Sequence, residues 1–176
     1  RSGSLGEQSG QSSIVFLSSA ELYSPDVDRW KISGTMIQAR GGHDSVTLGD
    51  GRVLVMGGRT VLTDEEDNSK TVDYIASAEL YDSSTNTWSA AGSMTEPRWG
   101  HSATILRDGK VLVAGGENKD GALTSVEIYD PSTNTWYATG SMTQARIGHG
   151  AKLLEDGRVL AGCSNSAVRI AFLARE

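Results

Sequence analysis

The sequence predicts an all-β fold made of one repeated unit of four short antiparallel strands. Three observations lead to this prediction. An ordered set of residues recurs three times within 176 residues. Short β-prone runs alternate with turn residues, and no window of 11 residues keeps the period of a helix. A fixed residue order at a spacing of about 50 residues indicates a repeat architecture.

The recurring residues stand at matching distances in each copy. Successive tryptophans, and likewise successive histidines, are 58 and then 48 residues apart. The ten extra residues fall between Gly58 and Glu79, in a single connection, so we expect that connection to be a loop. The recurring positions are Trp30, Trp88, Trp136, His43, His101 and His149.

Within one unit, local sequence predicts four strands in order. The first, His101–Leu106, ends at Asp108-Gly109, a pair that favours a tight hairpin turn with positive φ at both central positions. The second, Val111–Ala114, is a continuous apolar run, as expected of a strand covered on both faces. The third, Ser125–Tyr129, ends at a turn cluster containing Pro, Ser, Thr and Asn. The fourth, Thr135–Met142, carries the tryptophan. One such sheet cannot bury both faces alone, so the units must stack, and a radial stack gives a propeller.

These residues resemble the kelch repeat over about residues 14 to 172. The resemblance rests on the double glycine, the Glu-x-Tyr-Asp step, the following Trp, and Met followed by Arg-x-Gly-His. The Asp-Gly-Arg/Lys-Val-Leu-Val motif looks more like those of bacterial kelch proteins and galactose-oxidase-like propellers than like those of animal actin- or ubiquitin-linked kelch proteins. The resemblance implies a kelch β-propeller whose histidine strand is innermost and whose tryptophan strand is outermost.

Propellers have about four to eight blades, whereas this chain supplies about three to three and a half four-stranded antiparallel blades, half a ring. At the C-terminus, Cys163-Ser164 replaces the double glycine and Arg169 stands in the Glu position. We expect a flexible lead or expression remnant at 1–13, an outer half-blade at 14–36, blades at 40–95 and 98–142, and an inner part-blade at 146–172.

Composition narrows the class of function. The 16 basic and 22 acidic residues give a net charge of −6 with no basic run. This argues against partners such as nucleic acid or an anionic membrane, and no apolar stretch approaches the roughly 18 residues that span a bilayer. The single cysteine excludes an internal disulfide.

Residues that recur once per unit are predicted to be structural. Three histidines suggest a metal site, but each occupies the same repeat position. The resemblance to galactose oxidase would require two tyrosines, two histidines and a cysteine around copper, and no such set can be assembled here, so we expect no metal and no cofactor. The predicted structural residues are Gly57, Gly58, Glu79, Tyr81, Trp88, His101, Gly115, Gly116, Glu127, Tyr129, Trp136 and His149.

Ligand binding is expected where the sequence departs from the repeat. One departure is the acidic insertion between Arg59 and Ile75, which binds a cation or a basic partner or is simply solvated. Another is Trp99, which suits an interface or sugar-stacking anchor, or fills a gap between blades. A third is the loop Glu117 to Gly121. The candidate binding residues are Arg59, Asp64, Glu65, Glu66, Asp67, Arg98, Trp99, Asn118 and Lys119.

The expected function is therefore a non-catalytic scaffold that recognises a protein or glycan through loops on a rigid frame. The alternative is a fragment of a galactose-oxidase-like or mutarotase-like propeller enzyme whose active residues lie outside this chain. The two incomplete ends also predict a head-to-tail homodimer, in which two chains complete each other's split blades.

Overall fold

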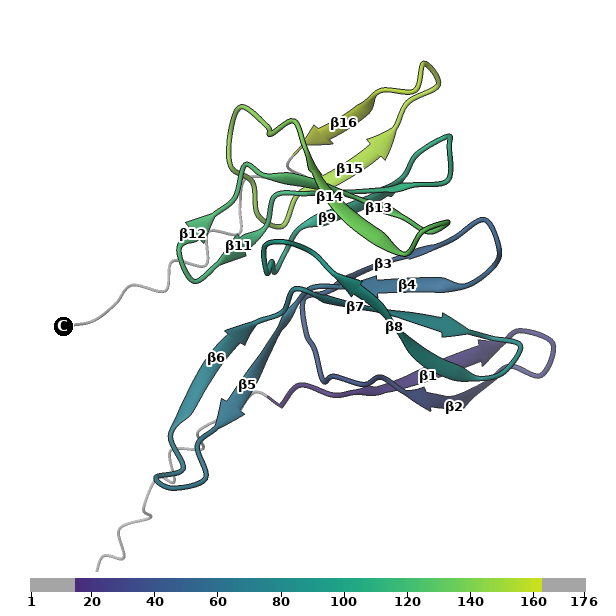
Figure 1. Cartoon of the computed structure of the whole chain (residues 1–176). Coiled ribbons are helices and arrows are strands. Elements are labelled where there is room, and N and C mark those ends of the chain that lie inside the picture. Colours follow the sequence, from purple (N-terminus) through teal and green to yellow (C-terminus); the bar gives the residue numbers. More distant parts are fainter. Residues whose placement is uncertain (1–14, 163–176) are drawn as a thin grey trace, which may run out of the picture.

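The computed structural model describes residues 15–162, and every regular element in that range is a strand (Figure 1). Two four-stranded antiparallel sheets form complete blades, and a two-stranded sheet flanks them at each end. The predicted all-β propeller fold, with blades of four antiparallel strands, is confirmed.

The first blade has the strand order β3-β4-β7-β8, and the second has the order β9-β10-β13-β14. The first blade consists of β3 (Asp44–Thr47), β4 (Val53–Met56), β7 (Ser77–Asp82) and β8 (Thr87–Ser93). The second consists of β9 (Ser102–Ile105), β10 (Val111–Ala114), β13 (Val126–Asp130) and β14 (Thr135–Thr139). The registers agree, since Val55 faces Glu79 in one and Val113 faces Glu127 in the other.

Each flanking sheet is one half of such a blade. The N-terminal half-blade, β1 (Ser19–Ser24) and β2 (Arg29–Thr35), corresponds to the third and fourth strands. The C-terminal half-blade, β15 (Gly150–Leu153) and β16 (Val159–Gly162), corresponds to the first and second. The predicted lead at 1–13 and the end of the part-blade at 146–172, with Cys163 and Arg169, lie outside the described residues.

Neighbouring blades touch along both their inner and their outer strands. The first strands β3, β9 and β15 contact one another in series, as do the last strands β2, β8 and β14. Backbone hydrogen bonds link the inner starts, from Gly100 N to Gly42 O at 3.2 Å and from Gly148 N to Gly100 O at 2.7 Å. This is the radial arrangement of a propeller.

The main hydrophobic core lies within and between the two complete blades. The apolar second strands β4 and β10 supply fully buried side chains, as expected for strands covered on both faces. The core cluster comprises Leu48, Leu54, Met56, Ala78, Leu80, Ala91, Met94, Val111, Val113 and Tyr129.

The turn after the first strand differs from the predicted two-residue turn. Gly109 N donates to Leu106 O, and Leu106 N donates to Lys110 O. Only Gly109 has a positive φ, of 83°. Asp108 keeps an ordinary φ because its carboxylate works as a side-chain cap, accepting the Lys110 N–H at 3.2 Å. The connection is therefore a three-residue loop closed by a left-handed glycine.

The ten-residue insertion is not an irregular loop. It forms a β-hairpin, β5 (Arg59–Thr63) and β6 (Lys70–Tyr74), with β-prone side chains paired across the strands, such as Val61 opposite Val72. We call residues 59–74 the arm. The second blade has a shorter hairpin there, β11 (Glu117–Asn118) and β12 (Gly121–Ala122). Both hairpins project from the same side of the structure (Figure 1).

Candidate functional site

A buried ion pair joins the second blade to the linker before it. Glu127 in β13 lies 2.8 Å from Arg98, with side chains 1% and 0% exposed. Glu127 also accepts the backbone N–H groups of Thr95 and Glu96 at 2.7 and 3.2 Å. Burial alone would raise the pKa of Glu127, but the Thr95 amide and the Arg98 guanidinium together lower it. The charge thus has the partners that burial demands.

The first blade is joined to its preceding linker in the same way. Arg40 lies 2.7 Å from Glu79, which accepts the N–H groups of Ile37 and Gln38 at 2.6 and 3.0 Å. The repeated Arg and Glu side chains are therefore engaged inside the protein.

The structure corrects the placement of Arg98 among the candidate binding residues. Its side chain is fully buried, and its guanidinium donates to the carbonyl oxygens of Gly115 and Ser125 at 2.8 and 3.1 Å as well as to Glu127. Adjacency to Trp99 in sequence suggested a shared surface, but consecutive residues of an extended segment point to opposite sides.

The recurring aromatic residues stabilise the outer strands. The Tyr129 hydroxyl donates to Asn134 Oδ1 at 2.9 Å, and its ring lies 5.0 Å from the Trp136 ring. Trp136 Nε1 donates to Ala91 O of the preceding blade at 3.0 Å. The first blade repeats these contacts with Tyr81, Asn86, Trp88 and Gly34.

The sequence predicts the turn that contains Asn134, but not the conformation or the tyrosine contact of the two turn asparagines. Asn86 and Asn134 have φ of 56° and 55°, so they hold the left-handed position of the turn as well as accepting the tyrosine hydroxyl. Their recurrence five residues after Tyr81 and Tyr129 was the available signal, because asparagine tolerates this conformation better than most residues.

The recurring histidines lie at the inner edge of the blades. His101 is buried, and burial together with the nearby Arg98 lowers its pKa to about 3, so it is neutral at physiological pH. His149 Nε2 lies 2.9 Å from Ser102 Oγ of the neighbouring blade. Within residues 15–162, no three His, Cys, Asp or Glu side chains are grouped so as to hold a metal ion.

The double glycines allow close approach of the next linker. Gly57 and Gly115 have φ of 64° and 63°, and a Cβ on either would lie 2.6 Å from a carbonyl oxygen, that of Arg98 or Arg146. Larger residues cannot occupy these positions without displacing the linker. Gly58 and Gly116 are similarly placed against backbone.

The departures from the repeat lie together on the hairpin side. The Arg59 guanidinium lies 4.2 Å from the centre of the Trp99 ring, within the range of a cation–π contact. Gly42 packs at the ring edge, where a Cβ would fall 1.8 Å from Nε1. Isolated antiparallel β-bridges pair Gly41 with Arg59 and Trp99 with Glu117. We call the arm, Trp99 and residues 117–122 the hairpin surface.

The polar residues of the hairpin surface are mostly exposed. At the arm tip, Asp64 Oδ1 accepts the Glu66 N–H at 2.8 Å, and Asp67 Oδ1 accepts the Ser69 N–H at 2.8 Å. These two carboxylates therefore shape the turn, whereas the Glu65 side chain projects into solvent. On the second hairpin, Asn118 is half-buried, and the exposed Lys119 pairs with Asp120 at 2.9 Å.

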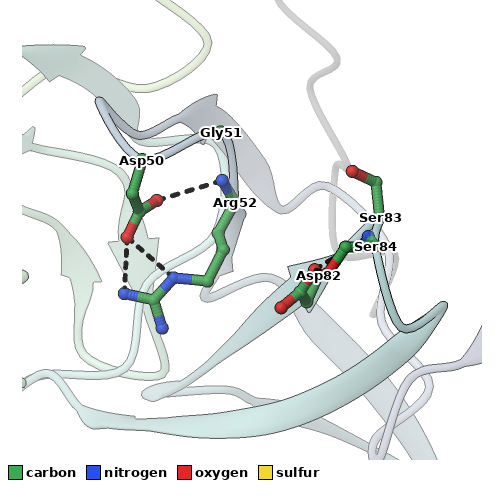
Figure 2. A pocket seen from close by; sticks show the side chains of 6 residues that line it. All are labelled: Asp50, Gly51, Arg52, Asp82, Ser83 and Ser84. Atoms are coloured by element: carbon green, nitrogen blue, oxygen red, sulfur yellow. Dashed lines mark hydrogen bonds and ion pairs between the residues drawn. The ribbon is translucent and has the colours of Figure 1, made fainter.

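A shallow pocket lies between two turns of the first blade (Figure 2). Arg52 Nη2 lies 2.7 Å from Asp50, and Asp82 Oδ1 accepts the Ser84 N–H at 2.8 Å. The polar groups thus satisfy one another, which leaves few to orient a ligand. The sequence did not predict this pocket. Its lining residues are Asp50, Gly51, Arg52, Asp82, Ser83 and Ser84.

Comparison with known proteins gives consistent results. A family model described as the Kelch motif matches residues 45–95 and 98–143, more than half of the chain. Beta-scruin of Limulus polyphemus is 33% identical over 106 residues, which are 57% of this chain and 10% of that protein. The structure published as that of YjhT superposes with a TM-score of 0.63 at 20% identity, over 78% of this chain and 48% of that one. The chain thus spans about a tenth and about half of these two proteins. Among the described residues, no helix is long and apolar enough to cross a membrane.

Proposed function

This chain belongs to the kelch-repeat family, and from that premise we propose that it is a non-catalytic scaffold that binds a protein or a glycan at the hairpin surface. One observation carries the proposal. The recurring Arg and Glu side chains of the two complete blades are engaged between blades, whereas the segments that break the repeat are linked by the Arg59–Trp99 contact and two β-bridges and project from one side (Figure 1). A rigid frame with variable connections is the usual arrangement of a recognition module.

The hairpin surface has the chemical variety that recognition needs. Trp99 and Arg59 offer an aromatic ring and a cation held together at 4.2 Å, two residue types enriched at binding hot spots. The arm adds the half-exposed Leu62 and Val72, each 52% exposed, on its two faces. Around them stand the acidic tip and the Lys119–Asp120 pair.

The proposal is tested by finding a ligand and then mapping it. Probes are a glycan microarray and a phage-displayed library of random peptides, each applied to the whole chain. The best binder is titrated against two variants, Arg59→Ala and Trp99→Gly, the second copying the Gly41 of the preceding repeat. We expect affinity to fall at least about tenfold in both.

Arg52→Ala is the matched control, because Arg52 is a half-buried arginine on the turn that lines the shallow pocket (Figure 2). Its affinity should equal that of the unchanged chain. Equal affinity in Arg59→Ala and Trp99→Gly, or loss only in Arg52→Ala, would move the binding site elsewhere. An absence of binders in both libraries would count against the scaffold function itself.

The alternative, an enzyme whose active residues lie on other blades, concerns sequence outside this chain. It predicts copper or calcium binding by a longer polypeptide that contains these repeats, together with tyrosine, histidine and cysteine ligands in the flanking sequence. Metal titration of that polypeptide separates the two functions, because a binding scaffold requires no such site.

A further inference from the structure

Each junction whose outer strands lie within the described residues is closed by the same two contacts. An outer-strand tryptophan places its indole on a glycine of the preceding blade, Trp88 on Gly34 and Trp136 on Gly92, so that a Cβ on either glycine would lie 3.2 or 3.4 Å from the indole Cδ1. A third-strand glutamate accepts two backbone N–H groups of the preceding linker, as Glu127 does from Thr95 and Glu96.

In the described part of the chain, the N-terminal half-blade leaves these groups exposed to solvent. Trp30 and Glu21 hold the tryptophan and glutamate positions, and Trp30 is 66% exposed. The Tyr23 and Trp30 rings already keep the blade arrangement, 5.3 Å apart at 44°, close to the 5.1 Å and 44° of Tyr81 and Trp88. The half-blade is therefore preformed for docking.

Apolar side chains of this half-blade are exposed where their counterparts are buried. Tyr23 is 46% exposed and Leu22 is 38% exposed, whereas Tyr81 and Leu80, at the same positions of the first blade, are each 5% exposed. The difference arises because β7 pairs with β4, whereas β1 has a strand only on its β2 side within the described residues. Such an edge favours pairing with another strand.

The C-terminal half-blade offers the complementary surface. Gly140 holds the position of Gly34 and Gly92, and a Cβ there would meet nothing within 4 Å. The edge strand β16 exposes Leu160 by 62%, although Leu54, its counterpart in the first blade, is fully buried. The exposed Thr143 and Gln144 hold the positions whose backbone N–H groups bind Glu127 in the preceding linker.

We propose that two copies of this chain join head to tail, each inserting its Trp30 against Gly140 of the other and pairing its β1 with the other copy's β16. The registers of the complete blades assign the pairs Glu21 with Ala161, Leu22 with Leu160, and Tyr23 with Val159. Each junction then completes one four-stranded blade from two half-blades.

The geometry favours a closed pair. Within the described residues, each copy contributes two complete blades and two halves, so two copies joined at both junctions give six blades, within the usual range of propellers. A head-to-tail contact that closes on itself gives a discrete assembly, not a fibre.

A second copy also matches the charge of the junction. At the two described junctions a third-strand glutamate meets a linker arginine, as Glu79 meets Arg40 and Glu127 meets Arg98. Glu21 of a second copy supplies such a carboxylate beside the linker whose Thr143 and Gln144 hold the positions of Thr95 and Glu96.

The test is the mass of the whole 176-residue chain in solution, measured by sedimentation equilibrium over a range of concentrations. We expect a reversible dimer of twice the 18.7 kDa of one chain. Trp30→Ala and Gly140→Leu act at opposite ends of the junction, and each should shift the mass to that of one chain. Gly140 has an open Cβ direction and no positive φ, so leucine there does not disturb the isolated chain.

Leu62→Ala is the control, because Leu62 is an apolar side chain of the arm, 52% exposed, and the arm forms a two-stranded sheet separate from those of both half-blades. It should leave the dimer intact. A junction variant tests the proposal if it keeps the far-ultraviolet circular dichroism of a β-sheet, and one such variant is sufficient. A monomer for the unchanged chain would overturn the proposal, as would a dimer in both junction variants or a mass that grows without limit. The half-blades would then be covered by other parts of a longer polypeptide.

Discussion

Replacing Arg98 with methionine tests how much of the stability of the fold depends on the buried charges between blades. Methionine keeps a long, flexible side chain but cannot donate a hydrogen bond. The substitution removes the contacts of the guanidinium with Glu127 at 2.8 Å, Gly115 O at 2.8 Å and Ser125 O at 3.1 Å. The Glu127 carboxylate then stays buried with only two backbone N–H groups as donors.

The expected cost follows from that leftover charge. Removing one partner of a buried ion pair costs about 3–5 kcal/mol, and small domains have a total stability of about 5–15 kcal/mol. Arg98→Met should therefore remove a large fraction of the free energy of unfolding. Glu127→Gln in the same chain removes the stranded charge while keeping an acceptor for the Thr95 N–H. The loss of stability in the double variant should be about 2 kcal/mol smaller than the sum of the losses in the two single variants.

Urea unfolding at fixed protein concentration, followed by tryptophan fluorescence, measures these free energies. Arg158→Met is the control, because the Arg158 side chain is 80% exposed and its pair with Asp156 contributes little. A loss below about 1 kcal/mol for Arg98→Met would mean that the junction behaves like a surface pair. Strict additivity of Arg98→Met and Glu127→Gln would mean that the two side chains do not interact, and either result refutes the reasoning.

Three further predictions concern other recurring positions. Lowering the pH from 7 to 5 should cost about 2 kcal/mol of stability, because burial lowers the pKa of His101 from 6.5 to about 3 and only the unfolded chain gains the proton in that pH range. Urea midpoints at the two pH values measure this loss, and His101→Asn should reduce the pH dependence. Trp136→Phe should cost about 1 kcal/mol in the same assay, because the indole N–H bond of 3.0 Å to the preceding blade is lost, and an unchanged midpoint would refute it. Gly115→Ala should lower the melting temperature far more than Gly109→Ala. Both glycines have positive φ, but only Gly115 has an oxygen, that of Arg146, 2.6 Å from the new Cβ; equal effects would show that backbone strain alone matters.

The fold was predictable because its signals are local and repeated. The strands after the Asp-Gly pairs, the apolar second strands and the order of elements in each blade follow from residues that the chain presents in register. The family was predictable for the same reason, since the double glycine and the Arg-x-Gly-His step serve specific contacts. Gly115, for example, allows close approach of the next linker.

Other features depended on information that a single sequence does not display. Arg98 and Trp99 are adjacent, yet one is buried between blades and the other lies under Arg59, because the extended backbone sends consecutive side chains to opposite sides. The centre of the insertion is acidic and rich in turn residues, so the sequence did not predict that its flanks pair as strands, with Val61 opposite Val72. The Asp-Gly turn was assigned the wrong φ for Asp108 because its side chain caps the backbone.

The location of the irregular residues has a physical cause. In a complete blade the turn between the first two strands is held by the aspartate cap and the left-handed glycine, as at Asp108 and Gly109. The turn between the last two strands is held by the bond from Tyr129 to Asn134. The connection between the second and third strands is held at its two ends, where Arg98 donates to Gly115 O and Ser125 O. The segment beyond those ends can lengthen, because the entropic cost of a longer loop rises only slowly with length. It is therefore the connection that accepts an insertion without disturbing the contacts between blades, which is why the hairpin surface, and not the turns opposite, is where a ligand-specific site can develop on this frame.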